Sequence, residues 1–265
     1  MAIERHVVED RTAFLRRLEH RVLRVVALVG LVALWELVTR VGVVSPLFLP
    51  SPLGVLGEGW DMARSGQLLV HLATSLERLA WGFAVGALAG ISVGVAVGFF
   101  SLADAVVQPV IAATFPIPKI ALLPLLILWL GIGEASKVAV VALGVFFPMA
   151  INTYSGVRQA DPVLIRAAVS FGAGRWSVIR KVILPSALPM VFAGLRLGAG
   201  IALLLLVAAE QIAADAGIGF LILQSGNLME TTRLMVGIVV LSLLGVLSTW
   251  GLAGLERIVI RWRHT

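Results

Sequence analysis

Residues 79–99 read LAWGFAVGALAGISVGVAVGF, a stretch without a single charged side chain. A helix that crosses a bilayer needs about 20 mostly apolar residues, so this stretch is long enough to span one. Glycine returns at every fourth position, which places the glycines on one helix face and lets a second backbone approach closely. We therefore predict a membrane-spanning helix whose glycine face packs against another helix rather than binding substrate. The glycines are Gly82, Gly86, Gly90, Gly94 and Gly98.

The composition of the whole chain leads to the same class of protein. Of its 265 residues, 59% are hydrophobic and 14% are charged, and the mean hydropathy is +1.01. A soluble domain has roughly 45–50% apolar and about 25% charged residues. The complete lack of cysteine excludes a disulfide framework, a thiolate zinc site and a cysteine nucleophile. We therefore predict an all-α membrane protein.

Apolar runs between charges predict about six spans, followed by a short tail. The stretch SPLFLPSP (residues 45–52) has three prolines and predicts a loop, with a short amphipathic helix after it. Four prolines interrupt the third span, which we expect to be bent. The domain boundaries that follow are an N-terminal segment at residues 1–21, a transmembrane domain at 22–256 and a tail at 257–265. The predicted spans are residues 22–41, 79–99, 106–130, 138–154, 188–209 and 235–255.

The basic residues orient this six-span arrangement. Six Lys or Arg residues precede or begin the first span, five lie in residues 158–181 and three lie in the C-terminal tail. All three segments fall on one side, and the positive-inside rule makes that side cytoplasmic, with both termini there. The net charge of +6 therefore records membrane topology, and we expect no nucleic-acid partner.

One cytoplasmic loop, residues 158–187, carries the strongest functional pattern. Residues 165–189 read IRAAVSFGAGRWSVIRKVILPSALP. Asp161 and Pro162 predict a helix start, and Gly172 with Gly174 can end that helix. A short helix held crosswise at the membrane face can act as a lever for a soluble partner, although a solvated basic loop is the plainer alternative.

The loop resembles the EAA loop of the permease subunits of bacterial ABC importers of the binding-protein-dependent type. Ala167, Ala168, Gly172, Leu184 and Pro185 stand at the motif spacing. The chain departs from the motif with Arg166 in place of the usual Glu and Val182 in place of Ile, so a family salt bridge from that Glu cannot be assumed. The segments SPLFLPSP, PLLILWLGIGEASK and AAEQIAADAGIGFLI resemble the nitrate, sulfonate and taurine branch of these permeases.

This resemblance implies a type I ABC importer permease fold in the bacterial inner membrane, acting by alternating access. The implied partners are a second permease copy in a homodimer, two ATP-binding subunits that hold ATP and Mg, and an extracytoplasmic solute-binding protein. No cofactor is expected on this chain. The implied substrate is taurine or another alkanesulfonate, with nitrate, bicarbonate or a thiamine precursor as alternatives. The loop residues implied to couple to the ATPase are Asp161, Arg166, Ala167, Ala168, Gly172, Arg175, Leu184 and Pro185.

Ionisable groups inside spans are costly and often face a partner or a water-filled path. Glu210 and the adjacent Gln211 end the fifth span, Arg196 lies in the same helix, and Lys119 lies in the bent third span. These four are the candidates for a pathway or gate, with structural pairing as the alternative for each. An anionic solute would be repelled by Glu210, which favours a gating role for that carboxylate.

Motifs for chemistry are missing from the sequence. There is no G-x-x-x-x-G-K-[ST] loop and no H-E-x-x-H, and the four histidines are dispersed. Residues 90–94 (GISVG) match G-x-S-x-G, but they lie inside the glycine-rich predicted span and not at the strand-to-helix turn that a nucleophilic serine needs. We therefore expect no catalytic residue, no metal site and no ATPase site, so energy must come from another chain. A membrane enzyme without a known motif and a passive channel remain as remote alternatives.

Overall fold

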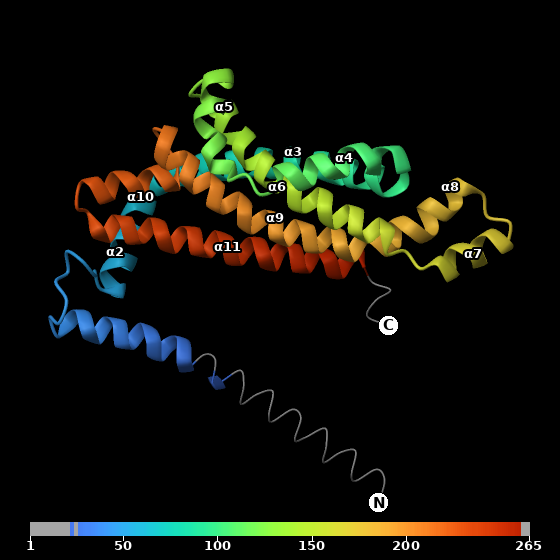
Figure 1. Cartoon of the computed structure of the whole chain (residues 1–265). Coiled ribbons are helices and arrows are strands. Elements are labelled where there is room, and N and C mark those ends of the chain that lie inside the picture. Colours follow the sequence, from blue (N-terminus) through green and yellow to red (C-terminus); the bar gives the residue numbers. More distant parts are fainter. Residues whose placement is uncertain (1–21, 24–25, 261–265) are drawn as a thin grey trace, which may run out of the picture.

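The computed structural model describes residues 22–23 and 26–260, and the regular structure in these ranges is entirely helical (Figure 1). Four helices are long and apolar enough to cross a membrane, and a bent pair can be counted as a fifth span. The expected all-helical membrane fold is confirmed. The long helices are α3 (Gln67–Phe99), α6 (Glu134–Arg158), α9 (Leu184–Ala213) and α11 (Thr231–Val259).

The expected first span is only partly described. Residues 26–40 are helical, residues 24–25 lie outside the described residues, and so do the basic segment 1–21 and residues 261–265 of the tail. The proline-rich loop leads to α2 (Pro52–Arg64), whose N-cap Ser51 accepts a hydrogen bond from the Gly54 amide at 3.1 Å. In the helix of residues 26–40, Arg40 pairs with Glu36 one turn earlier, with 2.6 Å between Nε and Oε1.

The glycine face of α3 lies directly against α6. At Gly90 an added Cβ would stand 2.6 Å from the carbonyl oxygen of Phe146 and 2.5 Å from Cβ of Met149. The other four glycines meet α6 at similarly short range. The two backbones are therefore close enough that only glycine fits, as the small-xxx-small rule describes.

The sequence prediction places the start of α3 at the wrong residue. The helix begins at Gln67 rather than at Leu79, because the charge at Arg78 does not end it. Arg78 is only 2% exposed. Its polar partners come from distant parts of the chain, so the hydropathy of one run of residues does not reveal that this charge is buried inside the helix bundle.

The third span is bent, as the prolines predict. The helix α4 (Ser101–Thr114) and the pair η1 (Lys119–Leu122) and α5 (Leu123–Leu130) meet at 92°. Lys119 donates from Nζ to the carbonyl oxygens of Thr114 and Ile117, both at 2.8 Å. Its ammonium therefore satisfies carbonyl groups that the break leaves without helical partners.

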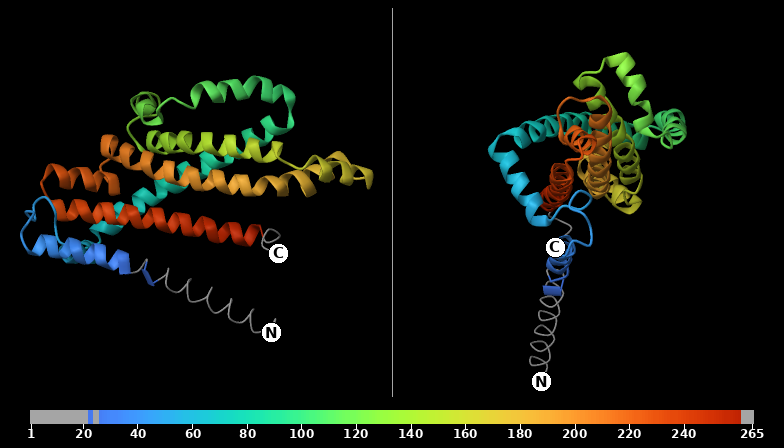
Figure 2. Two further views of the ribbon diagram at one scale, coloured as in Figure 1. Left: turned by 60° about the horizontal axis from the view of Figure 1, so that its bottom comes forward. Right: turned by 90° about the vertical axis from the view of Figure 1, so that its left-hand side faces the viewer.

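The core is centred on α6, which packs against α3 on one side and α9 on the other. Val140, Val145 and Met149 of α6 are fully buried there with Leu206 of α9. The shorter α10 (Ile218–Asn227) packs against α9 and α11. Figure 2 shows α3 crossing the other long helices obliquely and continuing into α4.

Candidate functional site

Two regions at opposite ends of the bundle hold the candidate functional residues. The loop end is where α6 ends and α9 begins, and it carries α7 (Pro162–Ser170) and α8 (Arg175–Val178). The cluster end is where α6 begins and α9 ends. Figure 1 shows α7 and α8 extending beyond the long helices at the loop end.

Local sequence explains why α7 forms. The Asp161 side chain accepts a hydrogen bond from the Val163 amide at 2.7 Å, and Pro162 occupies the first turn. At the other end Gly172 adopts φ +80°, and the Ala173 amide donates to the Ala168 carbonyl at 3.0 Å. This is a Schellman ending with glycine in the left-handed position. The motif glycine is therefore needed for backbone geometry.

The outer surface of α7 is apolar and uncovered. Val163, Leu164 and Val169 are all exposed, and the side chain of Phe171, which follows α7, is 92% exposed. Arg166 is also exposed, and no acidic side chain within the described residues pairs with it. A large uncovered apolar patch on a short projecting helix is typical of a protein interface.

The remaining loop residues lie beyond α7. Arg175 begins α8, and Leu184 with Pro185 lies where the helix continues into α9. The join is a π-helical turn, Ile179–Ile183. Because Pro185 has no amide hydrogen and its ring excludes the carbonyl one turn earlier, the helix widens at this point. The Leu-Pro pair of the motif therefore sets a local change of helix geometry.

At the cluster end, Glu210 is completely buried with both carboxylate oxygens engaged. Ser75 donates from Oγ to Oε1 at 2.8 Å, and the Gly219 amide donates to Oε2 at 2.8 Å. Arg78 donates from NH1 to Oε1 at 2.9 Å. The carboxylate is paired with an arginine and hydrogen-bonded to protein groups, and it does not face an open path in this structure.

Arg78 is the centre of this cluster, although it is not among the site residues predicted from the sequence. Its guanidinium also contacts Glu134, with 2.7 Å between NH2 and Oε1, and donates to the Ala216 carbonyl at 2.6 Å. One arginine thus joins the start of α6, the end of α9 and the turn after it. Burying a charge is costly unless it is paired and hydrogen-bonded, and every partner here supplies that pairing.

The turn between α9 and α10 is held by one face of α3. Gly217 donates its amide to Nδ1 of His71 at 3.1 Å, and Ile218 donates to Oγ of Ser75 at 2.8 Å. His71, Ser75 and Arg78 follow the i, i+4, i+7 spacing of one helix face. That spacing was the signal in the sequence that could have found these residues.

Of the other pathway candidates, Lys119 and Arg196 lie apart from Glu210, and Gln211 is its neighbour in the chain. Lys119 caps the break after α4 and lies 4.0 Å from the ring centre of Phe147. Arg196 pairs with Glu256 of α11, and Gln211 is half-buried beside Glu210. The structure therefore does not bring the four candidates together.

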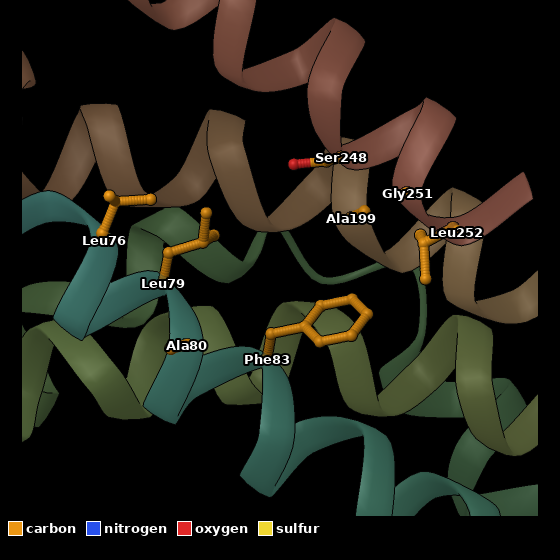
Figure 3. Close-up of a pocket in the computed structure, with 8 residues that line it drawn as sticks. All are labelled: Leu76, Leu79, Ala80, Phe83, Ala199, Ser248, Gly251 and Leu252. Atoms are coloured by element: carbon orange, nitrogen blue, oxygen red, sulfur yellow. The ribbon is translucent and has the colours of Figure 1, made fainter. Parts of the chain in front are cut away.

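None of the four candidates lines the groove between α3, α9 and α11. It has a volume of about 350 Å³, and Figure 3 shows Phe83 of α3 facing Leu252 of α11 across it. Apart from Ser248 its lining side chains are apolar. It offers no charge to an ionic solute.

Comparison with known proteins places the chain in a family. Residues 84–261 match the family described as binding-protein-dependent transport system inner membrane component. The Taurine transport system permease protein TauC of Escherichia coli is 39% identical over 237 residues, which are 88% of this chain and 86% of the relative. A second relative is the "Putative aliphatic sulfonates transport permease protein SsuC" of Bacillus subtilis. It is 36% identical over 89% of this chain and 85% of the relative.

A further relative and a solved structure complete the comparison. The Riboflavin transport system permease protein RibX of Chloroflexus aurantiacus is 35% identical over 96% of both chains. The inward-facing MetNI methionine ABC transporter matches with a TM-score of 0.62 and 21% identity, covering 70% of this chain and 93% of that chain. The solved structure shows the fold, which is that of an ABC importer permease. This chain is therefore a multi-pass permease subunit that belongs to the binding-protein-dependent transport system inner membrane component family.

Proposed function

We propose that this chain is the membrane subunit of an ATP-driven importer for taurine or another alkanesulfonate. The observation that carries the substrate class is the similarity to permeases named for taurine and aliphatic sulfonates over most of both chains. The relative named for riboflavin makes a larger organic solute the second candidate. Nitrate, bicarbonate and a thiamine precursor are further alternatives.

The proposed mechanism couples ATP hydrolysis on partner chains to movement of this bundle. In it α7 inserts its exposed apolar face into a groove of an ATP-binding subunit, and Phe171 is the most exposed anchor. The π-helical turn before α9 then passes the displacement of α7 into the bundle. Two permease copies and two ATP-binding subunits complete the assembly, with a solute-binding protein at the cluster end.

We expect taurine-loaded solute-binding protein to stimulate ATP hydrolysis by the reconstituted complex, and riboflavin-loaded solute-binding protein to leave the hydrolysis rate unchanged. Stimulation by the riboflavin-loaded protein alone would overturn the proposed substrate.

Phe171→Asp should weaken binding of the ATP-binding subunit about 30-fold or more, because loss of a hot-spot side chain costs at least ~2 kcal/mol. Phe48→Asp is the matched control, since Phe48 is also exposed but lies in the loop before α2. Copurification measures the association, and an unchanged affinity for Phe171→Asp would contradict the docking role.

The proposed orientation places the loop end in the cytoplasm. The absence of cysteine makes single-cysteine variants unambiguous, and Ser65 and Ser170 are both exposed at opposite ends of the bundle. We expect a membrane-impermeant maleimide to label S65C in intact spheroplasts and S170C only after permeabilisation, because basic loops stay inside. The reverse labelling pattern would refute this orientation.

A further inference from the structure

A second groove lies at the loop end, between the end of α3 and the helix that leads into α9. Its volume is about 530 Å³, within the range of ligand sites, about 300–1,000 Å³. Its walls are apolar and aromatic except for one guanidinium. Its lining includes Phe99, Phe100, Arg175, Trp176, Ile179 and Leu184.

The π-helical turn shapes one wall of this groove. The Leu184 amide donates to the Ile179 carbonyl, five residues earlier, instead of to the carbonyl four residues earlier. Both residues of this widened turn line the groove. π-turns are rare and are frequent at functional sites, so the groove coincides with the most unusual backbone segment of this helix.

The groove lies at the level of the membrane boundary. The spanning helix α3 ends at Phe99, and the continuous helix that contains α9 begins at Arg175, so Phe99 and Arg175 of the two walls lie at helix termini. The side chain of Trp176 is 71% exposed, and Phe100 is also exposed. Tryptophan is typical of the interface between lipid headgroups and hydrocarbon, which places one part of an occupant in the headgroup layer and the rest in the apolar layer.

The charges that residues 175–181 bring to the groove have one sign, and Asp104, four residues after Phe100, pairs with Arg158 instead. Arg175, Arg180 and Lys181 are exposed, and none of them has an acidic side chain within ion-pair distance in the described part of the chain. Asp161 is the one acidic residue of residues 161–181, and it caps α7. A basic cluster next to a membrane helix attracts anionic headgroups by about 1 kcal/mol for each cation.

We propose that this groove binds one anionic phospholipid. The acyl chain lies between Phe99 and the π-helical turn, and the headgroup phosphate faces Arg175 next to Trp176, with Arg180 and Lys181 adding to the local potential. A second copy of the chain would offer apolar surface, but the described surface of its loop end has no acidic patch to pair with Arg175, Arg180 and Lys181. The site is separate from α7, which leaves that helix free for the ATP-binding subunit.

Native mass spectrometry of the full chain in detergent, with equal phosphatidylglycerol and phosphatidylcholine, tests this proposal. We expect the wild type to retain phosphatidylglycerol preferentially, Arg175→Gln to lower its ratio to phosphatidylcholine about fivefold, the effect of one interfacial cation, and Trp176→Ala to lower retention of both lipids. Arg64→Gln and Trp60→Ala are matched controls on α2, where Arg64 lies 6.0 Å from the Trp60 ring and Trp60 is 65% exposed. The controls should bind lipid as the wild type does.

Three results would overturn the proposal. Equal retention of the two lipids by the wild type would remove the anionic preference. Unchanged retention by both groove variants would place any bound lipid elsewhere. Photocrosslinking from a benzophenone amino acid at position 176 in membranes should capture lipid, and capture of another polypeptide would identify the groove as a protein interface. Each measurement is made without transport, so it is independent of the proposed substrate.

Discussion

Gly90→Ala is expected to destabilise the fold by about 2–3 kcal/mol, although the same change usually stabilises an open helix by about 1 kcal/mol. The added Cβ would lie 2.6 Å from the Phe146 carbonyl oxygen, and a backbone carbonyl cannot rotate away as a side-chain tip can. The helices α3 and α6 would have to separate along their shared face. Equilibrium unfolding in mixed micelles measures the effect.

The control for this prediction is the same substitution in an open position. A Cβ added at Gly57 of α2 has no neighbour within 4 Å, so Gly57→Ala is expected to raise stability slightly. Opposite signs for one chemical change would isolate the packing term from helix propensity. Equal effects at the two sites would show that the backbones of α3 and α6 are farther apart than described.

Arg78→Met is expected to cost about 3–5 kcal/mol, because removal of one member of a buried ion pair leaves the other charge unpaired. Glu210 would lose its cation while remaining completely buried. The double variant Arg78→Met with Glu210→Gln removes both charges, and we expect it to be less destabilised than the sum of the single variants. The free energy of unfolding in micelles gives this coupling energy directly.

Arg233 provides a matched control, since it too contacts two carboxylates, those of Glu58 and Glu230. Its side chain is 40% exposed, so we expect Arg233→Met to cost no more than about 1 kcal/mol. A similar cost for both arginines would contradict the special role of burial at the cluster end. Preserved stability in Arg78→Met would show that the turn after α9 does not depend on this arginine.

Much of the fold was predictable from local sequence. A bilayer leaves no water for the backbone, so long apolar runs must be helices, and the glycine spacing indicated which face of α3 packs closely. The start of α7 was equally local, because Asp161 caps an amide two residues away. The bend of the third span followed from prolines that cannot continue a helix.

The candidate site was less predictable because its partners are distant in sequence. Glu210 was identified as a costly intramembrane charge, but its partner Arg78 lies 132 residues away, and the second carboxylate on that arginine belongs to Glu134, 56 residues away. Each charged residue alone looks like the boundary of a span. Their pairing is visible only when α3, α6 and α9 are assembled.

The sequence by itself determined that this chain is a bundle of membrane helices with a projecting loop helix, because hydropathy, caps and proline act over one or two turns. Only the tertiary structure decided where the charges go. It buried Arg78 inside a span, covered the Glu210 carboxylate with the turn at residues 217–219, and formed the groove beside Trp176. These features depend on contacts between segments far apart in the chain, and the free energy of burying a charge is set by those contacts rather than by neighbouring residues.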